Sequence, residues 1–161
     1  MINEKEKKLN VLLLAPHPFF QNRGTPIDVE LVIRALSERN DIELDALVYP
    51  EGEDVSYPNV TLSRVTIFGK IKGIRPGFSF KKLLVDFGMI FSSWRMTHKN
   101  RYDVIHAGEE SVFIAMFLKF IYGIPYVYDI DSSIAQQMVE KYPHLTFLST
   151  FFNGLERRAI K

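Results

Sequence analysis

Apolar and polar positions follow two different periods along the chain. Short apolar or alternating segments predict strands, at residues 11–15, 42–48, 60–68, 103–107 and 125–130. Segments with apolar residues every three or four positions lie between and after them and predict helices, at residues 26–39, 79–98, 109–122, 132–141 and 145–161. Because strands and helices alternate, the pattern favours right-handed βαβ crossovers and a parallel sheet covered on both faces. The predicted fold class is α/β, in a single domain over residues 1–161.

Two of the predicted helices carry distinct apolar stripes. In the helix of residues 26–39, Ile27, Leu31 and Ala35 recur every four residues, with Val32 and Leu36 beside them. The helix of residues 79–98 has an aromatic stripe, which we expect to cover the sheet, consisting of Phe80, Phe87, Phe91 and Trp94.

Composition and charge exclude several classes of protein. The formal net charge of +1 argues against a dedicated nucleic-acid binder, which would usually be strongly basic. The absence of cysteine excludes disulfides and cysteine metal sites, and it is compatible with a reducing cytoplasm. No apolar signal region follows the first ten residues, and the run Val112–Leu118 is too short to span a membrane. We therefore expect a cytoplasmic protein.

A basic flank lies within this nearly neutral chain. From Arg64 to Arg101 there are nine basic residues and one acidic residue, Asp86. The glycine-rich loop in this region carries Lys70, Lys72 and Arg75, which are candidates for peripheral contact with an anionic membrane surface or an anionic substrate. An ordinary solvated face is the alternative explanation.

The carboxyl ends of the predicted strands hold the unusual segments, and ligands of α/β sheets bind at this edge. The stretch "APHPFFQNRGTPIDVE" after the first strand is longer than a plain strand-to-helix turn. Gly24 permits a close approach of ligand to backbone, and we expect Thr25 and Asp28 to form a capping box. The helix start attracts anions such as phosphates, although Asp28 would compete there.

Two later strand ends also carry candidate polar residues. In "VIHAGEESVF", His106 lies near the strand end and Glu109 opens the helix, where an acid also complements the helix dipole. In "YVYDIDSSIAQQ", Asp129 and Asp131 point to the same side of an extended segment. This pair suggests acid–base or metal chemistry, with helix capping as the alternative. No GxGxxG follows the first strand, so a dinucleotide fingerprint is absent.

Taken in order, three segments resemble the N-terminal domain of a GT-B glycosyltransferase of the large retaining family 4. They are "NVLLLAPHPFFQNRGTPIDVELVIRALSERNDIELDALVYPEG", "YDVIHAGEESVFIAMFLKFIYGIPYVYDIDSS" and "LERRAIK". The resemblance implies a Rossmann-like acceptor domain, which forms one half of a GT-B fold. A second, donor-binding domain, which this chain lacks, would be its partner. The donor would be a nucleotide-sugar, and neither a metal nor a cofactor would be tightly bound.

The resemblance also implies roles for individual residues. The loop residues expected beside the donor diphosphate and the acceptor are Arg23, Gly24 and Thr25. Asp131 falls nearest the reacting centre, and His106 is the other catalytic candidate. The residues expected to face the acceptor are His17, Phe19, Glu109 and Asp129.

The expected function is transfer of a sugar to a glycan or lipid-linked acceptor, with the chain inactive by itself. The enzyme would be cytoplasmic or peripheral at the inner face of the membrane. Two alternatives stay open. One is half of a sugar-nucleotide epimerase of the same architecture, and the other is a flavodoxin-like or receiver-like binding module.

Overall fold

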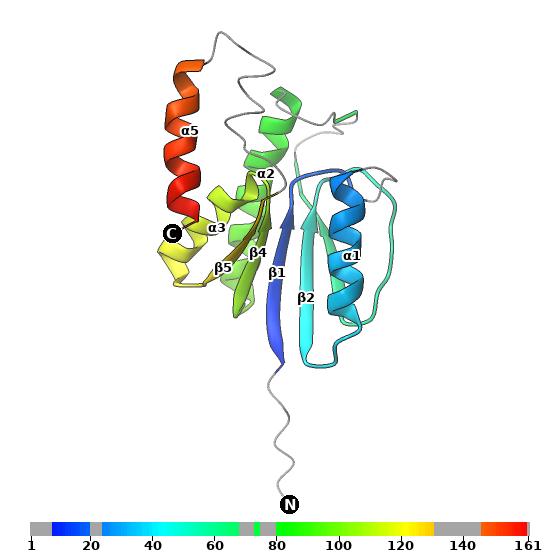
Figure 1. Cartoon of the computed structure of the whole chain (residues 1–161). Helices are drawn as coiled ribbons and strands as arrows, with labels where there is room; N and C mark the ends of the chain where they lie inside the picture. The colour runs from blue at the N-terminus through cyan, green and yellow to red at the C-terminus, as the bar shows by residue number, and fades with distance from the viewer. Residues whose placement is uncertain (1–7, 20–23, 68–72, 75–79, 131–145, 161) are drawn as a thin grey trace, which may run out of the picture.

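The chain forms a five-stranded parallel sheet with helices on both faces, as the sequence predicted (Figure 1). The structure is a computed structural model, and it describes residues 8–19, 24–67, 73–74, 80–130 and 146–160. The strands lie in the spatial order β3-β2-β1-β4-β5. Their bounds are β1 Leu9–Ala15, β2 Ile42–Val48, β3 Val60–Arg64, β4 Val104–Gly108 and β5 Tyr126–Asp129.

Four of the predicted helices are described, and each lies within two residues of its predicted bounds. They are α1 Thr25–Ser37, α2 Phe80–Lys99, α3 Ser111–Tyr122 and α5 Thr146–Ala159. The helix predicted over residues 132–141 lies outside the described residues. Gly123 ends α3 in the left-handed conformation, with φ of 71°, as a glycine at this position favours. None of the described helices has the length and apolar character needed to cross a bilayer.

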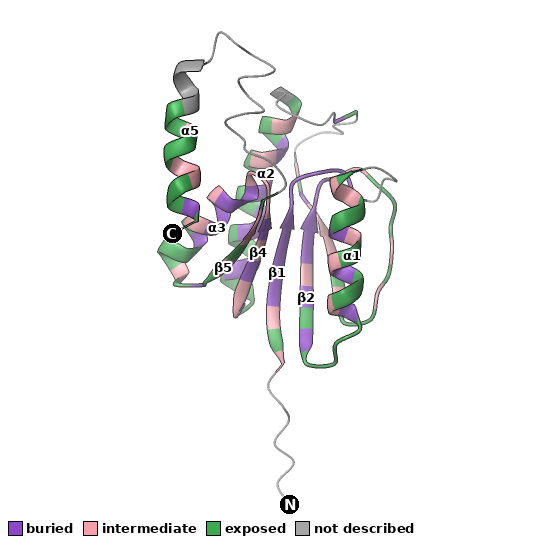
Figure 2. Ribbon diagram, in the orientation of Figure 1, coloured by how far each residue is buried: buried purple, intermediate pink, exposed green. Residues whose placement is uncertain are grey.

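The sheet separates two hydrophobic clusters. Leu12, Leu14 and Ile105 face α2, α3 and α5, whereas Leu13 and Ala46 face α1. The middle strands are buried on both faces, as expected for parallel strands between two helical layers (Figure 2). Burial of these aliphatic side chains is the main force that holds the layers together.

The apolar stripe predicted for α1 is buried only in part, since Val32 and Leu36 pack against the core while other members are exposed. Ile27 and Leu31 are 39% and 58% exposed, whereas Val29 and Ile33 are buried against β1 and β2. The helix has apolar residues on most of its surface, so a spacing of four selects more than one stripe. Packing on the sheet, and not the periodicity alone, decides which one is buried.

The prediction that the aromatic stripe of α2 covers the sheet is also wrong. Phe87, Phe91 and Trp94 are 74%, 59% and 42% exposed, and the sheet side of α2 is formed by smaller or polar residues. Gly88 lies in close contact with the chain after β3, since a Cβ there would lie 2.6 Å from Ile67 Cγ2. The helix therefore approaches the sheet closely through small residues and turns its aromatic rings outward.

Candidate functional site

The candidate site lies where the strand order reverses, between β1 and β4. The helices that follow β1 and β4 pack on opposite faces of the sheet, and ligands of α/β sheets bind at the carboxyl edge where this happens. The loop after Ala15 and the turn after Gly108 lie at this edge. The sequence predicted both segments as parts of a site.

The β1 loop and the β4 turn meet through one side-chain contact. Thr25 Oγ1 at the start of α1 donates to Glu109 Oε1 at 3.4 Å. The structure thus brings together Gly24, Thr25 and Glu109, although Thr25 and Glu109 are 84 residues apart in the sequence. Three of the predicted site residues are therefore neighbours in space.

The expected capping box at α1 is wrong. Gly24 is the N-cap, with φ of 44° and ψ of −136°, and no side chain caps the helix. The Thr25 hydroxyl bonds to Glu109, and Asp28 makes no capping hydrogen bond. The start of α1 therefore has no side-chain cap, although Asp28 still places a carboxylate in its first turn.

Glu109 has an unusual backbone conformation. Its φ of 46° lies in the left-handed region, which a residue other than glycine rarely adopts. The turn is fixed from both sides, because Glu109 N–H donates to Asp129 O at 3.3 Å and Ser111 Oγ donates to Leu14 O at 3.1 Å. Such strain persists where the surroundings fix the backbone, and it occurs often at functional sites.

Lys82 brings α2 into the site. Its Nζ lies 3.6 Å from Glu109 Oε2 and forms a closer ion pair with Glu110 Oε1. The side chains of Lys82, Glu109 and Glu110 are 11%, 16% and 22% exposed, so their charges are poorly screened by water. Although burial by itself lowers the pKa of Lys82, the neighbouring carboxylates raise it above its ordinary value.

Three carboxyl groups surround this one ammonium group. Burial raises the pKa of Asp86, Glu109 and Glu110, and repulsion from Glu110 raises that of Glu109 further. Tyr49, which follows β2, donates a hydrogen bond to Asp86. Burial and the nearby carboxylates also raise the pKa of the Tyr49 hydroxyl. The cluster therefore holds carboxyl groups that take up protons more readily than exposed ones, which suits acid–base or hydrogen-bonding chemistry.

His17 lies at the same edge and is buried, with 8% of its surface exposed. Burial, followed by repulsion from Lys82, lowers its pKa to about 4, so the ring is neutral at pH 7. Neither ring nitrogen has a hydrogen-bond partner among the described residues. A buried polar group without a partner is costly, and a bound ligand could supply that partner.

Phe19 has a different environment from the one expected. Its ring is fully buried in the hydrophobic cluster under α1 and has no exposed surface for an acceptor. Its carbonyl oxygen accepts a hydrogen bond from Arg64 Nη1 at 3.3 Å. The same guanidinium group bonds to Tyr49, Glu51 and other residues of the loop after β2. Phe19 and Arg64 thus hold the loops that frame the site.

His106 and Asp129 form a separate pair. His106 Nε2 lies 3.5 Å from Asp129 Oδ2, and the two side chains are 22% and 47% exposed. His106 pairs with Leu13 in the sheet and so lies on the α1 face. The pair adjoins the Glu109 turn through the Asp129 carbonyl. Asp131 and Arg23, together with the loop cations Lys70, Lys72 and Arg75, lie outside the described residues.

The sequence reasoning missed four residues of the cluster, which are Tyr49, Lys82, Asp86 and Glu110. One signal was available, because Lys82 and Asp86 are four residues apart and therefore lie on the same side of a helix. Asp86 is also the one acidic residue in a basic region.

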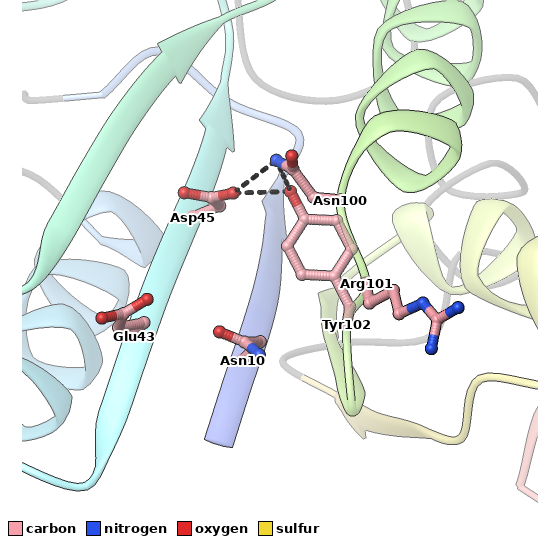
Figure 3. Close-up of a pocket in the computed structure, with 6 residues that line it drawn as sticks. All are labelled: Asn10, Glu43, Asp45, Asn100, Arg101 and Tyr102. Atoms are coloured by element: carbon pink, nitrogen blue, oxygen red, sulfur yellow. Dashed lines mark hydrogen bonds between the residues drawn. The ribbon is translucent and has the colours of Figure 1, made fainter. Parts of the chain in front are cut away.

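A pocket of about 400 Å³ lies at the opposite edge of the sheet (Figure 3). There Tyr102 donates to Asp45 Oδ2 at 2.6 Å, and Asn100 Nδ2 donates to the same oxygen at 3.3 Å. These bonds join β2 to the turn before β4. Since this is the amino edge of a parallel sheet, we assign the network a structural role.

No known protein family has a model that matches the sequence, and no curated protein matches it significantly.

Proposed function

We propose that this chain is the acceptor-binding domain of a retaining glycosyltransferase. The full enzyme would transfer a sugar from a nucleotide-sugar to a glycan or lipid-linked acceptor. The observation that carries the proposal is the contact between Thr25 and Glu109, which joins the β1 loop to the β4 turn at the reversal of strand order. The ordered sequence resemblance to the family is a second, independent support.

Each part of the site has a task in this proposal. The start of α1, which has no side-chain cap, would attract the donor diphosphate. Glu109 and the buried His17 would hydrogen-bond the acceptor hydroxyl groups. Lys82 would hold Glu109 in place and balance part of the negative charge. Catalysis would depend on positioning and on electrostatic stabilisation, with no tightly bound cofactor.

The test is sugar transfer by the polypeptide of the whole reading frame that contains this chain. UDP-, GDP- and ADP-sugars are supplied with candidate acceptors in the presence of EDTA. We expect transfer that survives EDTA, and a loss of about tenfold or more in Glu109→Gln, because that variant loses hydrogen bonds to a charged group. Glu43→Gln, at the opposite edge of the sheet, serves as the matched control and should keep full activity.

Three results would overturn the proposal. Conversion of the nucleotide-sugar without an acceptor would indicate an epimerase. Full activity in Glu109→Gln would remove the site from the reaction. A requirement for a metal held by Asp129 would contradict the expected chemistry.

A further inference from the structure

The polar cluster at the carboxyl edge holds more acidic than basic groups. Within the described part of the chain, the ammonium group of Lys82 contacts the carboxyl groups of Glu109 and Glu110 and attracts that of Asp86. When these three carboxyl groups are ionised, the cluster has a net negative charge. Because the side chains are largely buried, water screens this charge poorly. A bound cation would compensate it.

Two buried polar groups lie on either side of this cluster, and neither has a hydrogen-bond partner among the described residues. They are the imidazole of His17, which follows β1, and the hydroxyl group of Tyr128 in β5. Since β4 lies between β1 and β5, the turn of Glu109 and Glu110 at its end separates them (Figure 1). Both groups also interact electrostatically with the cluster. Burial, followed by repulsion from Lys82, lowers the pKa of His17, whereas burial and nearby carboxylates, including Glu110 and Glu109, raise the pKa of Tyr128 to about 12.

The acceptor atoms of these groups match one kind of ligand. The ring of His17 is neutral at pH 7, so one nitrogen has a free lone pair and the other carries a hydrogen. The hydroxyl oxygen of Tyr128 can also accept a hydrogen bond. Glu109 Oε2 lies 3.6 Å from Lys82 Nζ, beyond ordinary hydrogen-bond distance, so it can accept from another donor. A primary ammonium group has three N–H donors, no acceptor and one positive charge, which matches both the acceptor atoms and the charge of the cluster.

We propose that the acceptor of this site carries a primary ammonium group, which binds beside Glu109 and between His17 and Tyr128. This inference rests on the proposed function, because it names the chemical class of the acceptor, an amino sugar or another amino alcohol. The ammonium group would donate to the carboxylate, to the imidazole and to the phenol oxygen. The N–H of His17 would then donate to a hydroxyl group of the same acceptor. A neutral polyol would leave the charge of the cluster uncompensated.

Binding is tested on the 161-residue chain with ethanolamine as the probe. NMR of isotope-labelled histidine follows the ring nitrogens of His17, whose signals are those that disappear in His17→Gln. We expect ethanolamine to shift these signals, because one ring nitrogen gains a hydrogen bond. Tetramethylammonium has the charge without an N–H donor, and ethylene glycol has a hydroxyl group in place of the ammonium group. At equal ionic strength, each of these two controls should bind at least about tenfold more weakly than ethanolamine.

Two variants test the residues that would hold the ammonium group. Tyr128→Phe should weaken ethanolamine binding by about fivefold, and it should not lower the free energy of unfolding, because the oxygen that it removes has no partner among the described residues. Glu109→Gln keeps the shape of the side chain and removes its charge, so it should weaken binding by about tenfold or more. Glu43→Gln, at the opposite edge of the sheet, is the matched control and should bind as the unchanged chain does.

The polypeptide of the whole reading frame tests the class of acceptor separately. With a nucleotide-sugar as the donor, amino sugars such as glucosamine are compared with neutral sugars of the same configuration, such as glucose. We expect kcat/KM to be at least about tenfold higher for the amino sugars, because a hydrogen bond between charged groups is stronger than one between neutral groups.

Three results would overturn this inference. The first is no shift of the His17 signals by ethanolamine, or an equal shift by either control. The second is unchanged ethanolamine binding in both Tyr128→Phe and Glu109→Gln. The third is transfer to neutral sugars in preference to amino sugars, which would leave the glycosyltransferase proposal intact. Ethanolamine binding without transfer from any nucleotide-sugar would instead overturn the proposed function and support the ammonium site.

Discussion

At the scale of single residues, Lys82 determines the electrostatics of the site. It is one cation among Asp86, Glu109 and Glu110, whose pKa values burial already raises. A buried charge without its partner is far less stable than the pair. The ion pairs of Lys82 therefore matter more for stability than surface ion pairs such as that of Arg39 with Asp41.

Lys82→Met should lower the free energy of unfolding by about 3 kcal/mol at pH 8. At pH 5 the loss should be smaller. The three carboxyl groups have higher pKa values in the folded chain than in the unfolded one, so they bind protons there and no longer repel one another. Urea denaturation at both pH values measures the difference. Lys81→Met, which changes an exposed neighbour, should cost less than about 0.5 kcal/mol, and equal effects of the two variants would contradict this account.

His17 gives a pH dependence of the opposite sign. Its pKa is lowered from 6.5 to about 4, so the unfolded chain binds a proton between these pH values and the folded chain does not. His17 therefore contributes to the decline of stability as pH falls from about 6.5 to 4, by up to about 3 kcal/mol.

His17→Gln should remove this contribution. Because the ring is neutral above about pH 4, the substitution leaves the charge of the cluster unchanged in that range. The measurement is the free energy of unfolding as a function of pH for both proteins. If the unfolding free energies of the two proteins change in parallel between pH 7 and 4, the pKa of His17 is the same in the folded and unfolded chain, which would contradict this prediction.

At the scale of secondary-structure elements, Gly88 determines how closely α2 approaches the sheet. A Cβ there would lie 2.6 Å from Ile67 Cγ2, 3.0 Å from Val65 Cγ1 and 3.3 Å from the Thr66 carbonyl oxygen. The last of these is a backbone atom, so the neighbourhood cannot simply rotate away.

Gly88→Ala should lower the free energy of unfolding by about 1–2 kcal/mol, although alanine favours helix by about 1 kcal/mol. Gly154 in α5 is the matched control, since its Cβ would meet nothing within 4 Å. Gly154→Ala should therefore raise stability, by up to about 1 kcal/mol. Thermal denaturation of the two variants compares them, and the same sign of effect in both would refute the packing argument.

The sequence predicts the elements well and their buried faces poorly. β1 is recognisable because it is apolar on nearly every residue, and β2 because its apolar residues Ile42, Leu44, Ala46 and Val48 alternate along the strand. In α1 and α2 the apolar residues surround much of the helix, so periodicity alone does not choose a face. The inward side of α2 carries Val85 and Met89 in the core, together with Gly88 and the charged Lys82, whose places only the tertiary contacts reveal.

The same limit applies to the candidate site. Gly24, Thr25 and Glu109 could be selected because they follow strands of a parallel sheet. The contact of Thr25 with Glu109 in place of a cap depends on the distance between two loops, which no local pattern contains. Lys82 lies within a helix and not at a strand end, so the position of the strands does not identify it as a site residue.

At the scale of the whole molecule, the strand order sets a gradient of stability across the sheet. β1 lies in the centre and pairs with β2 and β4, whereas β3 and β5 each have one strand partner among the described residues. β5 is also short, and Val127 in its middle is 55% exposed. Edge strands with exposed side chains open more readily than central ones.

Hydrogen exchange should follow this gradient. We expect peptides from β1 to exchange most slowly and peptides from β5 to exchange at least about tenfold faster, because local opening at the edge costs less free energy. Mass spectrometry of digested, labelled protein gives the rates, with β2 as the reference for a second strand paired on both sides. Equal protection of β1 and β5 would mean that the sheet opens only as one unit.

The left-handed backbone of Glu109 has a consequence for how the sequence can change. Glycine adopts φ of 46° without steric cost, so a chain selected for stability alone would favour glycine at this position. The glutamate there carries a steric cost, and it places a carboxyl group beside Thr25 and Lys82 that glycine would not supply. Under the proposed function, position 109 is therefore one where backbone stability and chemistry favour different amino acids, glycine for the first and glutamate for the second.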